Sequence, residues 1–532
     1  MLWASPEPFS IRAIPQITGE PSAQMRSSHP SCYGGLSLSW RSMSFNTPFD
    51  LVTAARMSMI EHGFEPEYPP QAKQELAALQ AHPPQPPANI SDLRHLLWSS
   101  IDNDTSRDLD QIEYAEALPD GTMRVLIGIA DVDAYVPKNS AIDKHAGIET
   151  VTVYTGAKNF SMLPDELSTG LTSLLEDQDR MCVVTEFTLD KDVCETESCV
   201  ASSRIYPALV NNKAQLAYSS VGAWLDGHAN PPPKVATSKE LQAQLRFQND
   251  IAQRLRLERF KHGALNIETG EVLATIENNE ISLNGEHKNS ATELIEDFMI
   301  AANGVVARTL QDHRISSLRR VVRTPERWNR IVAVAGELGY KLPATADSRA
   351  LNDFLLQRNK EDPDHFPDLS LAIVKLLGPG EYVLERAGDP PQGHFGLAVE
   401  DYTHSTAPNR RFADLVTQRL LKAMIAGKPS PYSDDELAAI ALKCTTRAAA
   451  ERKVEREMQK RIAAVAMRHR IGEHFQAIVT GVTSSGTFVR TIAPRVDGML
   501  VRGQHGVDVG DRLHVQLVRT DPQRGYIDFE RI

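Results

Sequence analysis

The feature that most constrains this chain is an acidic cluster, in which Asp102, Asp104, Asp108 and Asp110 fall within nine residues. Their charges repel one another at close range, so a fold that gathers these side chains needs a cation among them. Mg²⁺ suits such a site, because it binds oxygen ligands, keeps several waters and is completed by a substrate phosphate. A pair of such ions about 3.5–4 Å apart activates water and stabilises the leaving oxygen of a phosphodiester. The cluster therefore points to metal-assisted chemistry on phosphate.

Two other interpretations of the cluster stay open at this point. A run of like charges is commonly a solvated loop. The spacing also follows a calcium-binding EF-hand loop, but Arg107 stands at the sixth position, where that loop needs glycine for its sharp turn. The residues that follow alternate like a strand and do not begin a helix. The oxygen-bearing positions of this comparison are Asp102, Asp104, Ser106, Asp108, Asp110 and Glu113.

The formal net charge of −12 does not favour a nucleic-acid partner, but the distribution of charge decides binding. Residues 441–472 carry nine Lys and Arg against three Glu, so this stretch offers a basic surface for phosphates. No run of about 18 apolar residues is present, so we expect no membrane span. The five cysteines form no CxxC pair and Cys194 and Cys199 have no nearby His, which predicts ordinary thiols, no zinc and a reducing cytoplasm.

Composition and periodicity divide the chain into four parts. Residues 1–42, rich in Ser and Pro, predict a disordered extension, and residues 43–90 a short helical segment with a linker. Residues 91–471 mix strands and helices, opening with a hairpin around the Pro119-Asp120-Gly121 turn and closing with a basic helical stretch over 434–470. Five short β-like runs separated by Gly, Asp and Pro fill residues 472–532, which predicts a small barrel of the OB type.

Several separated motifs, in a constant order, resemble those of the RNase II (RNB) family of 3′-5′ exoribonucleases. The resemblance covers roughly residues 91–532 and implies an α+β catalytic domain, with mixed sheets and helices around an RNA channel, followed by an all-β OB-fold barrel. The motifs are Ser100–Gln111, Ile129–Val132, Tyr154–Pro164, Leu167-Ser168, Leu294–Asn303, His394–Leu397, Tyr402–His404 and Pro408–Leu415.

The resemblance implies a role for each matching residue. Single-stranded RNA would be hydrolysed processively to 5′-nucleoside monophosphates with Mg²⁺, or Mn²⁺ in its place, as the cofactor. The implied metal ligands are Asp102, Asp108, Asp110 and Gln111, and the implied catalytic residues are Asp108, Asp110 and Arg410, the last of which would contact the scissile phosphate. The implied RNA-binding residues are Tyr154, Tyr218, Glu296, Arg411, Phe475 and Phe488, with Glu455 a further channel residue and Arg490, Arg495 and Arg502 on the face of the barrel.

Three departures from the family pattern accompany the resemblance. Gln111 stands where the family has a fourth clustered aspartate, so one neutral ligand would replace a charged one. The segment 263–267 lacks the aromatic residue that sandwiches the terminal bases, and the paired cold-shock domains do not fit before residue 91. An alternative of a different class is therefore an RNA-binding protein that keeps the fold and has lost hydrolysis.

The remaining expectations concern partners and location. Single-stranded RNA is the expected partner, with no membrane and no stable protein partner, and the chain is expected to act as a monomer. A cytoplasmic location is expected, although Arg12, Arg26 and Arg41 give the first residues a faint resemblance to a transit peptide.

Overall fold

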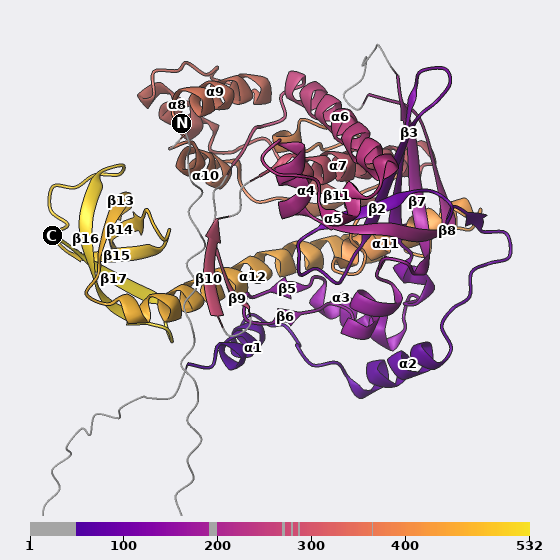
Figure 1. The fold of residues 1–532 in the computed structure, drawn as a ribbon, viewed down its shortest axis with the longest axis horizontal. Helices are drawn as coiled ribbons and strands as arrows, with labels where there is room; N and C mark the ends of the chain where they lie inside the picture. Colours follow the sequence, from indigo (N-terminus) through magenta and orange to yellow (C-terminus); the bar gives the residue numbers. More distant parts are fainter. Residues whose placement is uncertain (1–48, 191–198, 269–271, 278–279, 286–287, 364) are drawn as a thin grey trace, which may run out of the picture.

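The protein is described by a computed structural model, which covers residues 49–190, 199–268, 272–277, 280–285, 288–363 and 365–532 (Figure 1). The predicted disordered extension over residues 1–42 lies outside these residues. The described residues form mixed sheets and helices followed by a closed barrel of five strands, which confirms the α+β fold expected from the sequence.

A six-stranded sheet forms the centre of the molecule, in the order β1-β8-β2-β3-β4-β7, and β7 pairs in addition with β8. The predicted hairpin is present as β3 and β4, which meet antiparallel with Gln111 opposite Ile129. β8 is 18 residues long and pairs in parallel with β2 while it pairs antiparallel with β7. The strands are β1 (Ser91–Asp92), β2 (Trp98–Asp102), β3 (Gln111–Ala117), β4 (Met123–Ala130), β7 (Asp179–Leu189) and β8 (Val200–Ala217).

Each face of this sheet is covered by helices, because neighbouring residues of a strand point to opposite faces. Ile127 packs with the helices α4 (Tyr218–Leu225), α6 (Lys239–Lys261) and α7 (Ser290–Asp312). Leu126, its neighbour in β4, packs on the other face with α3 (Ala141–Glu149) and α11 (Phe412–Ile425). The sheet is thus fixed between two apolar layers, and its strand ends hold the loops of the site.

A helical group with its own core lies beside this centre. It comprises α8 (Trp328–Glu337), α9 (Ser348–Glu361) and α10 (Phe366–Leu377), which pack around Phe354 and Phe366. The two-stranded sheet of β11 (Ser317–Val321) and β12 (Glu381–Glu385) flanks the group in sequence. The smaller elements of this part of the chain are two helices and two hairpins. The helices are α2 (Pro70–Ala81) and α5 (Pro233–Ala236), and the hairpins are β5–β6 (Val153–Tyr154 and Asn159–Phe160) and β9–β10 (Val272–Glu277 and Glu280–Gly285).

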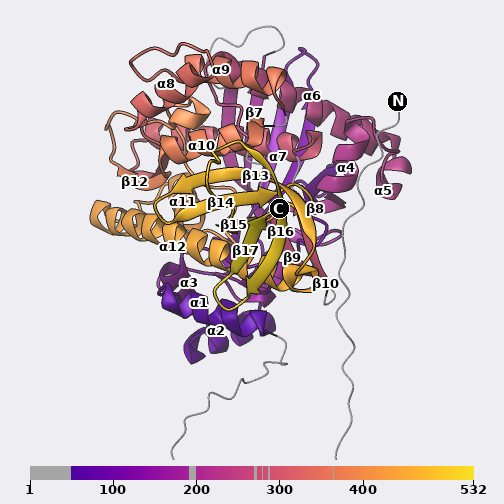
Figure 2. The same cartoon turned by 90° about the vertical axis from the view of Figure 1, so that its left-hand side faces the viewer.

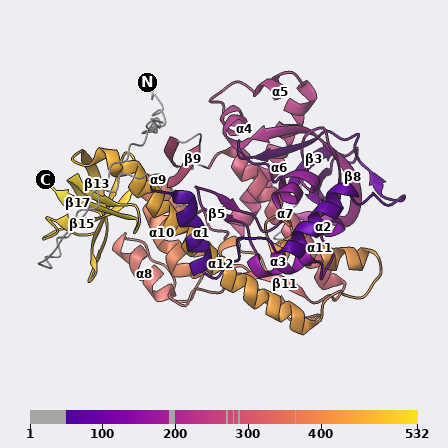
Figure 3. The same ribbon diagram turned by 90° about the horizontal axis from the view of Figure 1, so that it is seen from below.

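The helix α12 (Asp434–Met467) extends over 34 residues and connects the central part of the chain to the barrel (Figure 1). Its start is capped by Ser433 and Glu436, each of which bonds the backbone of the other. The N-terminal helix α1 (Leu51–Glu61) lies along α12 (Figure 3), with Met59 buried against Met458. The segment before residue 91 therefore includes a helix that is packed on the main body.

The C-terminal strands close into a barrel in the order β13-β14-β15-β17-β16, in front of the other elements in Figure 2. Phe475 and Phe529 meet edge to face in its core, with a ring-centroid distance of 6.1 Å. Met467, the last residue of α12, belongs to the same core, so the helix and the barrel form one packed unit. The strands are β13 (His474–Thr483), β14 (Gly486–Thr491), β15 (Asp497–Arg502), β16 (Arg512–Asp521) and β17 (Tyr526–Arg531).

Two further expectations are tested by the fold. Cys182 and Cys444 are free and buried, but Cys199 is disulfide-bonded, so the prediction that it is an ordinary thiol is wrong. In the part of the chain that the structure describes, no helix combines the length and the apolar character needed to cross a bilayer.

Candidate active site

The acidic cluster lies in the loop between β2 and β3, and a second loop meets it from about 300 residues away. Asp110, which is 1% exposed, accepts a hydrogen bond from the backbone N–H of Asn409 at 2.9 Å. Its second oxygen lies 3.3 Å from Nε of Arg410. Asn409 and Arg410 immediately precede α11, so the packing of α11 on the central sheet places the predicted catalytic arginine against the predicted catalytic aspartate.

Electrostatics couple these groups. Burial raises the pKa of Asp110 to about 7, although Arg410 and the Asn409 N–H oppose the shift, and the nearby charge of Asp108 adds to it. Burial alone would lower the pKa of Arg410, but the surrounding acidic groups, Asp102 among them, outweigh burial and raise it. Arg410 is therefore held fully charged among the predicted metal ligands.

Tyr154 completes this group from the β5–β6 hairpin. Its hydroxyl donates a hydrogen bond of 2.9 Å to Asp108, and burial raises its pKa above the usual range. The ring remains 36% exposed, which leaves a face available for stacking. Asp108, Asp110, Tyr154 and Arg410 are thus brought together as the sequence predicted.

The carboxylates fit a metal site only in part. Asp108 is close enough for its charge to raise the pKa of Asp110, which suits an ion that takes two carboxylates and completes its shell with water and a phosphate. Asp102 instead accepts hydrogen bonds from Ser106 Oγ at 2.9 Å and from the Asn103 N–H at 2.7 Å. Among the described residues no three Asp, Glu, His or Cys side chains form a group that could hold an ion. The expected convergence of Asp102, Asp108 and Asp110 is therefore not found, and metal binding by them and by Gln111 stays a prediction.

The other predicted RNA-binding residues are less closely associated with the site. Tyr218 begins α4, and Glu296 on α7 pairs with Lys288 at 2.9 Å. Arg411 is bound to Asp414 at 2.7 Å, although it also lines the pocket described below.

On the barrel, one of the two predicted stacking residues must be corrected. Phe475 is only 5% exposed, because it fills the barrel core against Phe529, so the prediction that its ring stacks on RNA is wrong. Phe488 is 37% exposed on β14 and remains accessible. A single Phe in a short strand does not show which face of that strand points into the core. The sequence alone therefore could not distinguish the buried Phe475 from the exposed Phe488.

A pocket of about 260 Å³ opens beside Arg410 and Tyr154. Glu451 of α12 lines it, in place of the Glu455 that the family resemblance implied. Arg320 carries no signal in the sequence, because β11 comes from a distant part of the chain and meets α12 and the loop before α11 only in the fold. The polar residues that line the pocket are Thr150, Thr152, Tyr154, Arg320, Tyr382, His404, Arg410, Arg411, Glu451 and Arg452.

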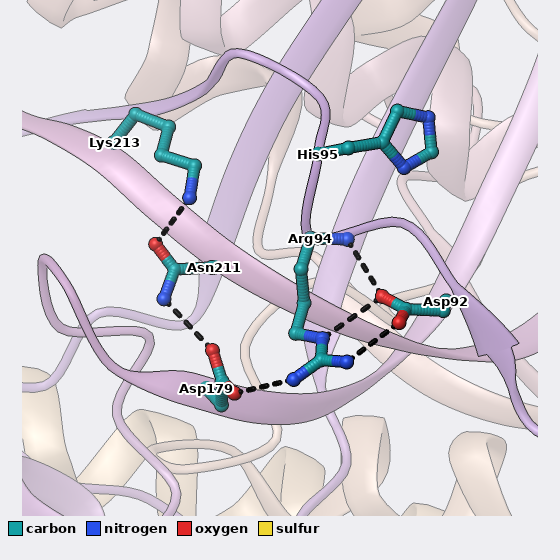
Figure 4. Close-up of a pocket in the computed structure, with 6 residues that line it drawn as sticks. All are labelled: Asp92, Arg94, His95, Asp179, Asn211 and Lys213. Carbon is teal, nitrogen blue, oxygen red and sulfur yellow. Dashed lines mark hydrogen bonds and ion pairs between the residues drawn. The ribbon is translucent and has the colours of Figure 1, made fainter.

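A larger hollow of about 440 Å³ lies elsewhere, beside β1 and the adjoining parts of β7 and β8 (Figure 4). Arg94 bridges Asp92 and Asp179 there, and Lys213 donates to Asn211. Its two aspartates are paired with Arg94, and none of its residues belongs to the acidic cluster. The smaller pocket, next to the buried Asp110–Arg410 contact, is therefore the candidate active site.

Comparisons with known proteins identify the family of the chain. Residues 90–427 match the RNB domain family, and residues 473–532 match the RNase II-type exonuclease C-terminal S1 domain. Ribonuclease R of Vibrio cholerae is 30% identical over 469 residues, which cover 84% of this chain and 54% of the relative. Ribonuclease R of Thermotoga maritima is 30% identical over 471 residues, covering 82% and 64%. The chain thus spans roughly half to two thirds of the length of these relatives.

Solved structures share the architecture. Mycoplasma genitalium RNase R in complex with double-stranded RNA has a TM-score of 0.77 and 25% identity, covering 91% of this chain and 84% of that chain. Yeast Ssd1, described as a pseudonuclease, has a TM-score of 0.65 and 16% identity, covering 88% and 59%. The second likeness concerns the fold alone.

Proposed function

This chain belongs to the RNB-domain family and carries an RNase II-type C-terminal S1 domain, and on that premise we propose that it is an exoribonuclease that hydrolyses single-stranded RNA from its 3′ end. The observation that carries the proposal is the contact of Asp110 with Asn409 and Arg410, beside a pocket lined by Tyr154. It joins a carboxylate suited to metal binding, a guanidinium suited to phosphate and an aromatic ring suited to a base.

Each of these residues has a chemical task in the proposed reaction. Arg410 presents a planar set of N–H donors to the phosphate and stabilises the negative charge that builds up during in-line attack. Asp110 orients Arg410 through the 3.3 Å contact. Tyr154, held by its hydrogen bond to Asp108, stacks on the terminal nucleotide, and stacking of this kind is worth about 1–3 kcal/mol per base.

A divalent cation belongs to the proposal as well. Asp108 and Asp110 would hold it, with Asp102 reaching it through a change of side-chain conformation. When bound, such an ion lowers the pKa of water and neutralises phosphate charge. The products would be 5′-nucleoside monophosphates, and recognition of 2′-hydroxyls would favour RNA over DNA. A monomer in the cytoplasm remains part of this proposal.

The rival proposal, an RNA-binding protein without hydrolysis, is motivated by Gln111 and by the absence of a three-carboxylate group among the described residues. Yeast Ssd1, a pseudonuclease, indicates that this fold is also used without hydrolysis.

One experiment separates the two. Wild-type protein is incubated with uniformly labelled single-stranded RNA over a range of Mg²⁺ and Mn²⁺ concentrations, alongside Asp110→Asn and, as a matched control, Asp120→Asn. Asp120 lies in the exposed β3–β4 turn, where it accepts from Thr122. We expect mononucleotides from wild type and the control and none from Asp110→Asn. Tight RNA binding by wild type without any release of nucleotide would establish the rival instead.

A further inference from the structure

Arg320 is held in one orientation at the wall of the pocket. Its guanidinium lies over the ring of Tyr382, 4.8 Å from the ring centroid. It also packs against Gly380, where an added Cβ would lie 2.7 Å from Nη2 of Arg320. The guanidinium therefore contacts both an aromatic ring and a backbone position at which a side chain would require it to move.

This arginine has no acidic partner. Arg410 is paired with Asp110 and Arg411 with Asp414, but Arg320 and Arg452 form no ion pair within the described parts of the chain. Nη1 of Arg320 is buried and makes no hydrogen bond to any described residue. A buried donor without a partner destabilises the free protein, and an anion in the pocket would relieve that cost.

The other titratable groups of the pocket do not compensate these charges. Burial and the neighbouring Glu455 raise the pKa of Glu451, which favours the neutral form of its carboxyl beside the arginines. Burial and the surrounding arginines lower the pKa of His404 well below its usual value, and its Nδ1 lies 2.8 Å from the Tyr382 hydroxyl. Burial also raises the pKa of Cys444 to about 12 and that of Tyr382. At neutral pH the pocket is therefore positively charged.

We propose that Arg320 and Arg452 form a subsite for a phosphate monoester on the nucleotide that occupies this pocket, in the part that the clustered aspartates do not line. The inference rests on the proposed function, since it assumes that the pocket receives a nucleotide. Guanidinium groups bind phosphate with several charge-assisted hydrogen bonds, and a volume of about 260 Å³ admits a nucleotide-sized group but no folded partner. The monoester has two sources, the 3′-phosphate of an RNA chain or the 5′-phosphate of a released nucleotide.

The test measures binding in the presence of a chelator, so that hydrolysis does not interfere. In one arm, oligoadenylates that end in a 3′-phosphate or a 3′-hydroxyl are titrated against wild type, Arg320→Met and Arg452→Met. In the other arm, adenosine 5′-monophosphate and adenosine compete with bound RNA. Arg323→Met is the matched control, because Arg323 lies two residues beyond β11's Val321 and its side chain is 61% exposed. Circular dichroism checks that each variant is folded. If Arg320→Met does not fold, the binding measured for Arg452→Met decides the result.

We expect wild type to prefer the phosphorylated ligand by about tenfold in at least one arm, the effect of one hydrogen bond to a charged group. Arg320→Met and Arg452→Met should lose that preference, and Arg323→Met should keep it. The arm in which the preference is lost identifies whether the phosphate monoester belongs to an RNA chain or to a released nucleotide. Equal binding of phosphorylated and unphosphorylated ligands in both arms, or a preference that both pocket variants retain, overturns the subsite. Failure of the proposed function is a separate observation, namely no nucleotide release from 3′-hydroxyl RNA with Mg²⁺.

Discussion

At the scale of single residues, Asp110 combines catalytic position with unfavourable burial. Its pKa is about 7 in the folded protein, against 3.8 for an aspartate surrounded by water, so the folded state holds a proton that the unfolded chain releases between these values. The free energy of unfolding should therefore fall as pH rises from about 4 to 7, by up to about 4 kcal/mol from this group. A residue of the proposed site thus reduces the stability of the fold at neutral pH.

The first prediction follows from this fall in the free energy of unfolding with rising pH. Asp110→Asn removes the titration, so the unfolding free energy of the variant, minus that of wild type, should increase between pH 4 and 7. Urea unfolding in chelator at several pH values measures it. Asp120→Asn is the control, because hydrogen bonds from Thr122 lower the pKa of Asp120 and confine its effect to acidic pH. A difference for Asp110→Asn that stays constant across this window would contradict the prediction.

The second prediction concerns Gln111, which is 5% exposed at the start of β3. Gln111→Asp adds a charged oxygen ligand beside Asp110, and we expect the Mg²⁺ concentration at half-maximal hydrolysis to fall about tenfold, the equivalent of ~1.4 kcal/mol. Gln111→Asn keeps a neutral carbonyl and should show no such fall. An unchanged Mg²⁺ requirement in Gln111→Asp would mean that this side chain does not reach the ion.

At the scale of elements, helix α1 supports the candidate active site through its packing. It packs on α12, Ser58 donates to Glu457 at 2.8 Å, and the same apolar cluster contains Val153, the neighbour of Tyr154. The hairpin that carries Tyr154 and the helix that carries Arg452 are therefore connected through a segment near the N-terminus.

The third prediction tests this support with two methionines of one helix. Met59 is fully buried and Met57 is 46% exposed. Met59→Ala should lower the unfolding free energy by about 2–4 kcal/mol and raise the KM for RNA, whereas Met57→Ala should change stability by less than about 0.5 kcal/mol. Thermal unfolding and steady-state hydrolysis measure both effects. Equal losses in the two variants would show that α1 is not held by its buried face.

Elements defined by local chemistry could be predicted from the sequence, and those defined by distant pairing could not. The Pro119-Asp120-Gly121 turn identifies the β3–β4 hairpin. The Gly, Asp and Pro residues that separate short β-like runs identify the five barrel strands. The parallel pairing of β2 with β8 and the packing of α1 on α12 depend on contacts across more than a hundred residues, for which periodicity carries no signal. In the same way motifs identified Asp110 and Arg410, while Arg320 and Glu451 join the pocket only through the tertiary fold.

At the scale of the whole molecule, a chain of net charge −12 must bind a polyanion through a local basic surface. Part of the basic stretch on α12 is used within the protein: the side chain of Arg447 packs over Phe64 and donates to the Ile148 carbonyl. Lys453 and Lys460 are exposed on the same helix and remain available to phosphates.

The fourth prediction is that RNA affinity falls with salt, with a slope that reports the number of phosphates neutralised. Lys453→Gln combined with Lys460→Gln should reduce the slope of log affinity against log salt by about 1.4, or ~0.7 for each phosphate that no longer meets a lysine. Lys360→Gln, an exposed lysine on the separate helix α9, is the control and should leave the slope unchanged. Fluorescence anisotropy in chelator measures all three proteins, and an unaltered slope in the double variant would exclude this face of α12 as an RNA-binding surface.

The continuity of α12 has a consequence for substrate length. Arg452 lines the pocket and Met467 belongs to the barrel core, and 15 residues of uninterrupted helix separate them by about 22 Å along the axis. Because both ends belong to one continuous helix, the distance between the candidate pocket and the barrel stays constant. A strand too short to bridge it loses its hold on the pocket or on the barrel completely, so this enzyme would release a final oligonucleotide whose size is set by the helix and not by the base sequence.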